Sequence, residues 1–191
     1  MQELLKDIGQ CTICEEDLPL KPRPVVQFNE MSKILVIGQA PGKKVHDSGI
    51  PWNDASGKRL RQWLGVDAEV FYNPSAFGIV PMGFCYPGKG KSGDLPPRKE
   101  CAPHWHSLIL QQLKKVELTL LIGQYAQRYY LKEEREKNLT ETVKHFQNYR
   151  PHYFVLPHPS PRNQFWLRKN PWFEESVIPV LRQMTTEIIG K

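Results

Sequence analysis

The sequence lacks any long hydrophobic run. No stretch approaches the roughly 20 apolar residues that a membrane-spanning helix requires, so we expect no membrane partner. Internal repeats and low-complexity tracts are also missing. The first residues, Met1 to Asp7, include acidic side chains and no apolar stretch of the kind found in secretory signals. We therefore expect a cytoplasmic protein, a compartment in which cysteines are normally reduced.

Acidic residues are fewer than basic ones. The 20 Asp and Glu residues face 26 Lys and Arg residues, so the formal net charge is +6. This excess favours an anionic partner, such as the backbone of a nucleic acid. Hydrophobic residues make up 40% of the chain and charged residues 24%, which is typical of globular proteins and not of disordered ones. A length of 191 residues predicts one domain over 1–191.

Cysteine is scarce, and its placement is informative. Cys11 and Cys14 form a C-x-x-C pair, whereas fifteen residues separate Cys85 from Cys101. The first pair is close enough to bind one metal centre, and the second could complete its coordination from the far side. Four thiolates suit iron–sulfur or zinc, and chance placement or a disulfide remains an alternative. A shared centre would join the N-terminal segment 1–30 to the loop 74–101.

Strand-like and helix-like segments alternate along the chain. Short apolar runs predict buried strands, and apolar residues at helical spacing predict the helices between them. Such alternation favours right-handed crossovers and a parallel sheet. We therefore predict an α/β fold, a three-layer α/β/α sandwich around a central four-stranded parallel sheet. The expected strands are 34–37, 70–73, 117–123 and 153–156; the expected helices are 2–9, 55–64, 103–115, 124–131, 139–146 and 174–189, with a polar loop at 43–53 and an irregular segment at 75–97.

Two loops follow predicted strands and have the composition of a binding site. Gly38-Gln39-Ala40-Pro41-Gly42 follows the first strand, at a turn where backbone can approach a ligand. His158-Pro159-Ser160-Pro161-Arg162-Asn163 follows the last one. In open α/β sheets, ligands bind at such strand ends. The alternatives are a tight turn for the first loop and a rigid proline-rich turn for the second.

These motifs together resemble the uracil-DNA glycosylase superfamily, most closely its iron–sulfur branches, the family 4 and family 5 types. The resemblance covers nearly the whole chain. Four features in the right order support it, and they are the Cys11/Cys14 pair, the Gly38–Gly42 motif, the Cys85/Cys101 pair and the motif that begins at His158.

The resemblance implies a fold, a cofactor and an activity. The implied fold is a four-stranded parallel sheet between helices, and the implied cofactor is a [4Fe–4S] cluster on the four cysteines. The implied activity is excision of uracil or a related deaminated base from DNA. The expected partner is thus DNA that contains a damaged base, bound by a monomer.

A glycosylase must extrude its target nucleotide, stack the base and read its edge. The resemblance implies that Trp52 stacks on the base and that Asn73 reads its edge. Gly38, Gln39 and Ala40 would form one wall of the base pocket. The alternative roles are a core anchor for Trp52 and an ordinary turn for Asn73, which precedes a proline.

Hydrolysis of the bond between base and sugar calls for a carboxylate that positions water and stabilises positive charge. The first motif carries none, because Gln39 and Ala40 stand where related branches have acidic or amide residues. Asp54, in Asp54-Ala55-Ser56-Gly57, resembles an implicated family 5 aspartate, and Asp47 is the second candidate. Asp54 could instead cap the helix that follows.

The second motif would supply the remaining groups. His158 would donate a hydrogen bond to the negative charge that develops on the base, and a neutral imidazole suffices for this. Ser160 would bind a phosphate, and Arg162 would serve as a positive or wedging contact.

The expected enzyme is a monofunctional glycosylase, because no motif position carries a lysine that could form a Schiff base. The alternative is a catalytically weak or inactive iron–sulfur DNA-binding protein of the same fold, which Gln39 and Ala40 make credible.

Overall fold

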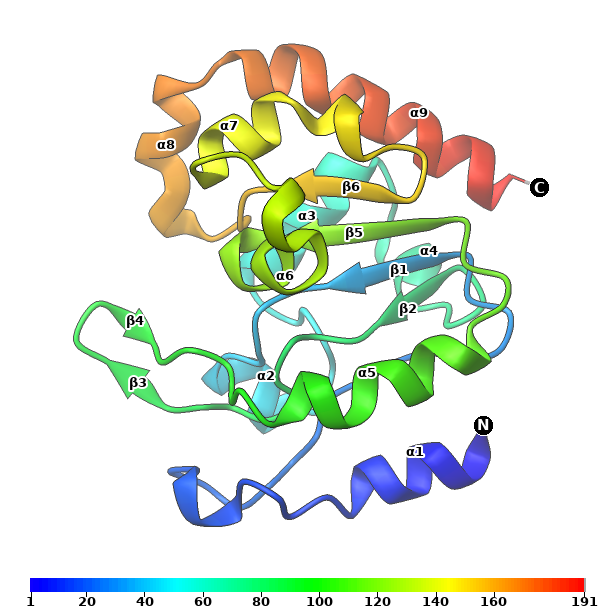
Figure 1. The fold of residues 1–191 in the computed structure, drawn as a ribbon, viewed down its shortest axis with the longest axis vertical. Helices are drawn as coiled ribbons and strands as arrows, with labels where there is room; N and C mark the ends of the chain where they lie inside the picture. The colour runs from blue at the N-terminus through cyan, green and yellow to red at the C-terminus, as the bar shows by residue number, and fades with distance from the viewer. Residues whose placement is uncertain (191) are drawn as a thin grey trace.

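The computed structural model describes residues 1–190 and contains a four-stranded parallel sheet (Figure 1). Its strands are β1 (Ile34–Ile37), β2 (Phe77–Ile79), β5 (Leu118–Ile122) and β6 (Tyr153–Leu156), in the order β2-β1-β5-β6. In the register of the sheet, Val36 lies between Ile79 and Leu120. The predicted fold class is confirmed.

Helices cover both faces of this sheet. In the view of Figure 1, α6 lies in front of the strands and α3 lies behind them, where it packs against α9. The result is the predicted three-layer α/β/α arrangement. The helices are α1 (Gln2–Gly9), α2 (Lys43–Ser48), α3 (Ala55–Leu64), α4 (Ala68–Phe71), α5 (Cys101–Gln112), α6 (Gly123–Leu131), α7 (Leu139–Lys144), α8 (Gln164–Lys169) and α9 (Ile178–Ile189).

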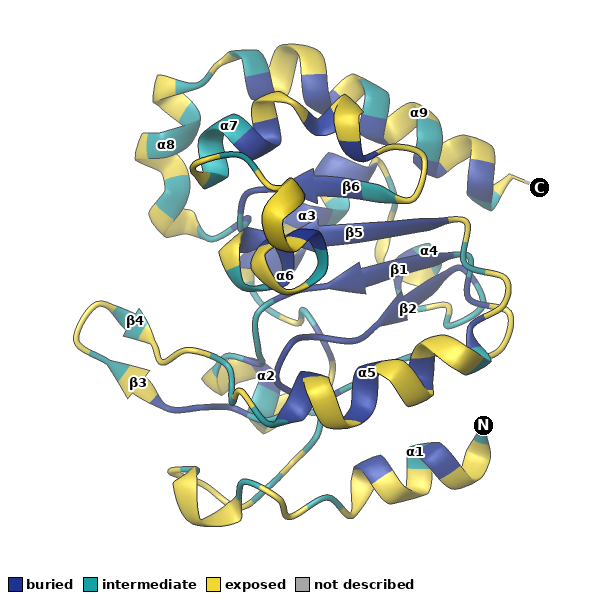
Figure 2. Ribbon diagram, in the orientation of Figure 1, coloured by how far each residue is buried: buried dark blue, intermediate teal, exposed yellow. Residues whose placement is uncertain are grey.

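The strands are buried along almost their whole length (Figure 2). Because helices cover both faces, the strand sequences are mainly apolar and do not alternate with polar residues, although β5 contains the buried Thr119. Gln127, on α6, is a further buried polar residue. Its amide donates hydrogen bonds to the carbonyls of Leu121 and Leu156, and it thereby joins the ends of β5 and β6.

The strand predicted over 70–73 is wrong, because this segment belongs to the one-turn helix α4 and the residues that end it. The Asp67 carboxylate accepts a hydrogen bond of 2.8 Å from the Val70 N–H, which caps the first turn of a helix. The second strand instead runs from Phe77 to Ile79. Its Gly78 lies against Leu35 of β1, where a Cβ would be only 3.2 Å from that side chain.

The other predicted elements differ less from those in the structure. The segment predicted as a polar loop, 43–53, contains helix α2. The helix predicted from 174 begins as a π-helical turn, Phe173–Val177, before α9. The helix predicted over 103–115 is α5, which begins at Cys101 and ends at Gln112. Within residues 1–190, no helix combines the length and the apolar composition needed to cross a bilayer.

A short hairpin occupies part of the segment that was predicted to be irregular. Strands β3 (Lys89–Gly90) and β4 (Gly93–Asp94) pair antiparallel around a two-residue turn, Lys91-Ser92. The hairpin projects from the body of the molecule on the side toward which the strands of the sheet point (Figure 1). Ser92, Gly93 and Asp94 of the hairpin segment line a cleft at the carboxyl ends of the strands.

Candidate active site

A cleft of about 590 Å³ opens at the carboxyl ends of the strands. All four strands of the sheet contribute to it through the segments at or just beyond their last residues. This is the edge at which open α/β sheets bind ligands. The lining includes Gly38 to Gly42 after β1, Ile79 and Pro81 at β2, Gln124 and Tyr125 after β5, and His158, Ser160, Arg162 and Asn163 after β6, together with Trp52, Asp54, and Ser92 to Asp94.

Trp52 lines the cleft and is half-buried. Its backbone adopts a left-handed conformation with φ of +56°, which is unusual for a bulky residue and marks a specified geometry. The indole rests on Gly38, where a Cβ would come within 2.7 Å of Cζ2. Its ring centroid is 5.6 Å from that of His158, and the two planes are inclined by 30°. The structure thus brings these two aromatic side chains together in the cleft.

Glycine is required at two positions around this tryptophan. Gly57, in the first turn of α3, lies directly against the Trp52 carbonyl, and any Cβ there would overlap the oxygen. Gly38 admits the indole itself. Because Gly38 of the first motif has no side chain, the Trp52 ring can approach the end of β1 closely.

The His158 ring has a defined tautomer. The backbone N–H of Ser160 donates to Nδ1 at 3.2 Å, and because this N–H can only donate, Nδ1 must be unprotonated. A neutral ring then carries its proton on Nε2. Burial lowers the pKa of His158 below its usual value, and the nearby charge of Asp54 opposes this shift. His158 is therefore a neutral donor at physiological pH.

Asp54 lines the cleft and also caps a helix. Its Oδ1 accepts a hydrogen bond of 2.8 Å from the Gly57 N–H at the start of α3. Its Oδ2 accepts no hydrogen bond from any residue in 1–190. The two roles that the sequence left open are thus compatible, because one oxygen caps the helix and the other remains available to a ligand.

Arg162 is held by the hairpin. Its Nη1 donates a hydrogen bond of 2.9 Å to the Ser92 carbonyl, and Gly93 leaves room for the guanidinium. On the other side, the Gln39 amide donates to the Leu95 carbonyl at 3.3 Å. The hairpin is therefore attached both to the first motif and to the loop after β6, and it forms a rim of the cleft.

Two predicted site residues lie outside the cleft. Asn73 precedes β2 and is therefore at the amino end of the sheet, because the strand is Phe77–Ile79 and not 70–73. Its side chain accepts a hydrogen bond from the Ser75 N–H, as in an ordinary turn. The positions that reach the cleft here are Ile79, the last residue of β2, and Pro81, two residues further on.

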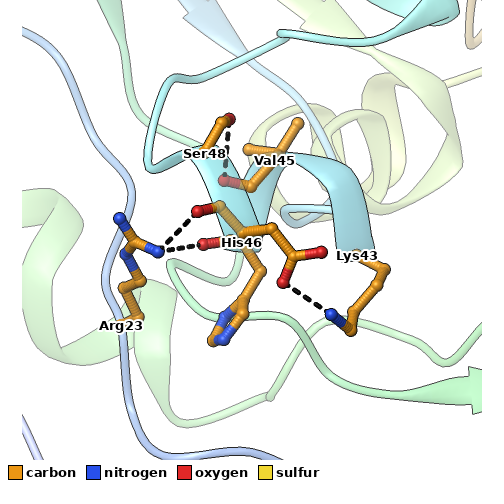
Figure 3. A network of polar contacts seen from close by, with 6 residues as sticks. Arg23, Lys43, Val45, His46 and Ser48 are labelled. Atoms are coloured by element: carbon orange, nitrogen blue, oxygen red, sulfur yellow. Dashed lines mark hydrogen bonds and ion pairs between the residues drawn. The ribbon is translucent and has the colours of Figure 1, made fainter.

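Asp47, the second of these residues, lies on the exposed side of α2, and its carboxylate is paired with Lys43 at 2.5 Å. Arg23 lies beside the same helix (Figure 3) and holds its carboxyl end, since it donates to the carbonyls of His46 and Asp47. The hydrogen bond from Lys43 lowers the pKa of Asp47, which is exposed. Asp47 therefore belongs to the surface of α2 and not to the cleft.

The sequence did not indicate the hairpin or Tyr125 as parts of the site. The pattern Gly90-Lys91-Ser92-Gly93, with two glycines around a two-residue turn, is the signal that could have revealed the hairpin. Nothing in the sequence alone predicts that it returns to the first motif.

The four cysteines gather around a second, small pocket. Cys11, Cys14, Cys85 and Cys101 all line it, and all four are free thiols. The Cys101 sulfur accepts a hydrogen bond of 3.3 Å from the Phe84 N–H. Burial raises the pKa of Cys85 to about 11 and that of Cys101 to about 12. In the part of the chain that is described, no three Cys, His, Asp or Glu side chains converge closely enough for a single metal ion.

Fold and cleft together define a class: α/β/α proteins with a cleft at the carboxyl edge of a four-stranded parallel sheet, lined by an aromatic ring, a neutral histidine and a carboxylate. The family model described as the uracil DNA glycosylase superfamily matches residues 25–182, and the chain belongs to this superfamily. The matched region contains every residue that lines the cleft and begins after Cys11 and Cys14.

Proposed function

We propose that the protein is a DNA glycosylase that hydrolyses the N-glycosidic bond of uracil or another deaminated base. The observation that supports this most directly is the meeting of Trp52, His158 and Asp54 in one cleft. Stacking, polarisation of the leaving base and stabilisation of positive charge are the three tasks of such an enzyme, and each of these residues suits one.

The base would enter against the Trp52 ring. Gly38, Gln39 and Ala40 form the adjacent wall, where backbone N–H groups and the amide oxygen of Gln39 can bind the edge of the base. Pro81 contributes an apolar contact with no N–H of its own. The edge would thus be read from the first motif, since Asn73 lies elsewhere.

His158 and Asp54 would act on opposite ends of the breaking bond. The C1′–N bond breaks with its electron pair leaving on the base, and Nε2–H of His158 donates a hydrogen bond to the base oxygen that gains negative charge. The free oxygen of Asp54 stabilises the positive charge on the sugar. Because both groups are oriented by backbone hydrogen bonds before substrate binds, little reorganisation is needed.

Contacts to the DNA backbone would come from the loop after β6. The Ser160 hydroxyl oxygen accepts a hydrogen bond from the Arg162 N–H at 3.2 Å, which leaves its proton free to donate to a phosphate. Arg162 is exposed and adds positive charge beside it. Since Arg162 is bound to the hairpin, we propose that it attracts the DNA backbone through its positive charge and does not insert between bases.

We also propose a monofunctional reaction, in which water and not a lysine attacks the sugar. Within residues 1–190, no lysine lines the cleft, and a Schiff base would require one. The expected product is an intact strand that carries an abasic site.

We propose that the four cysteines bind a [4Fe–4S] cluster, with zinc as the less favoured alternative. Four free thiols surround one pocket, which is the donor set of such a cluster. Four thiolates also suit zinc, so metal analysis of the purified protein must separate the two. When bound, the cluster would serve as a structural cross-link between residues 1–30 and the loop 74–101.

A catalytically weak DNA-binding protein of the same fold is the second candidate. The absence of a carboxylate from Gln39 and Ala40 favours it. Oligonucleotides with uracil, hypoxanthine or xanthine, in single and double strands, separate the two when alkali reveals abasic sites. Abasic product supports the enzyme, whereas retained binding without product at high protein concentration supports the alternative.

A further inference from the structure

We propose that Asp94, on the β3–β4 hairpin, is a catalytic residue that accepts a proton from the attacking water. This inference rests on the proposed glycosylase function. Asp94 supplies, from a segment distant in the sequence, the carboxylate that the first motif does not contain.

The position of Asp94 places a carboxylate beside the first motif. Asp94 lines the cleft, and its Oδ2 lies 3.3 Å from the point where a Cβ on Gly42 would stand. Gly42 is the last residue of the motif that carries Gln39 and Ala40. The carboxylate therefore lies against the very wall that has no acidic residue of its own.

The Asp94 carboxylate is also free to bind water. It makes no hydrogen bond or ion pair with any residue in 1–190. In contrast, Asp54 uses one oxygen to cap α3, and Asp47 is paired with Lys43. A general base needs a free lone pair directed at water, and Asp94 has both oxygens available.

Hydrogen bonds on both sides of Asp94 anchor the hairpin segment that carries this carboxylate. Arg162 binds the Ser92 carbonyl, and Gln39 binds the Leu95 carbonyl, so the residues on both sides of Gly93 and Asp94 are anchored. The hairpin closes on itself through the Leu95 N–H, which donates to the Gly88 carbonyl at 2.8 Å. A short hairpin anchored in this way can position a catalytic group.

The two carboxylates then have separate roles. Asp54 lies near His158, whose pKa its charge affects, and stabilises the sugar cation. Asp94, on the Gly42 side, takes one proton from water as the C1′–O bond forms and the C1′–N bond breaks. It passes that proton to the departing base, so the products are free base and an abasic site, and the carboxylate is restored.

The test is a single-turnover excision assay on the full chain with a uracil oligonucleotide. We expect Asp94→Asn to lower the rate about 100-fold or more, within the range of general-base catalysis. DNA affinity should stay equal or rise slightly, because a negative charge is removed. Asp7→Asn, an exposed aspartate on α1, is the matched control and should retain the full rate.

A second variant separates chemistry from hairpin structure. Asp94→Ala should be equally slow and should recover activity when formate is added, because a small carboxylate can take the vacated place. Full activity in Asp94→Asn, or a slow Asp94→Ala that formate does not restore, would overturn this inference alone. No product with the unaltered protein would overturn the proposed function and this inference together.

Discussion

Asp54 shows how one residue can satisfy a structural and a chemical demand. An asparagine at this position can accept the same hydrogen bond from Gly57, since Asn and Asp cap helices about equally well. The negative charge beside the cleft is lost. We therefore expect Asp54→Asn to change the free energy of unfolding by less than about 0.5 kcal/mol and to slow excision by about 10²-fold or more.

Asp67→Asn is the matched control for this variant. Asp67 caps α4 through the same kind of hydrogen bond, at 2.8 Å, but does not line the cleft. Urea unfolding and single-turnover rates of both variants should show equal stability and a rate loss in Asp54→Asn only. Equal losses of stability and rate in Asp54→Asn would mark Asp54 as a cap with no chemical role.

His106 is a buried histidine that contacts Pro81, one of the residues that line the cleft. Its Nε2 lies 3.0 Å from the Pro81 carbonyl, which can only accept, so Nε2 carries the proton. Nδ1 then accepts from the Tyr130 hydroxyl at 2.6 Å. Burial lowers the pKa of His106 from 6.5 to about 4. Nothing in the sequence indicates this role, because the three residues come from separate segments.

This shift predicts a pH dependence of stability. The unfolded chain binds a proton at His106 more readily than the folded one, so stability is fully present above pH 6.5 and falls as the pH drops toward 4. The loss can reach about 3 kcal/mol. His106→Gln, whose amide can make both hydrogen bonds, should show a shallower fall in urea unfolding between these pH values.

His104→Gln, on the exposed side of the same helix, is the control. It should keep the slope of the unaltered protein. An identical slope in His106→Gln and the unaltered protein would contradict the assignment of His106 as a buried neutral group.

At the scale of elements, the hairpin depends on Arg162. Arg162→Ala removes the hydrogen bond to the Ser92 carbonyl, so the hairpin should open more often. We expect faster trypsin cleavage at Lys89 and Lys91, both exposed, and a slower excision rate.

Arg168→Ala removes the same charge from α8 without a contact to the hairpin and should leave both rates unchanged. Equal cleavage of the two variants would show that Arg162 does not hold the hairpin.

The sequence predicted three of the four strands but placed the second one too early. Val70 and its aromatic neighbours have high strand propensity, yet the cap at Asp67 starts a helix there. The true strand contains Gly78, a poor strand former that is needed because Leu35 packs against it. Such a packing requirement is tertiary and cannot be read from the segment itself.

The misplaced second strand also explains which site residues were correctly predicted from the sequence. Trp52, Asp54 and His158 were identified because the motifs at and near strand ends carry them, and they meet in the cleft. Asn73 was placed at a strand end that does not exist. Asp94 was not identified, because only the hydrogen bonds of the folded hairpin bring it back to Gly42.

At the scale of the molecule, the cysteine pocket joins the N-terminal segment to the body. If a cluster fills it, anaerobically purified protein should contain iron and sulfide and absorb visible light. Cys101→Ala should lose iron and unfold at a lower temperature, because the cross-link is removed. Stoichiometric zinc without iron would contradict the cluster and support the alternative ion.

Excision of a deaminated base in this cleft is tested directly by measuring the release of uracil from an oligonucleotide by the unaltered protein. We expect alkali-sensitive abasic sites, uncut strands before alkali, and loss of product in His158→Ala with DNA binding retained. Binding of oligonucleotides that contain uracil, hypoxanthine or xanthine, with no abasic product at high protein concentration, would contradict it.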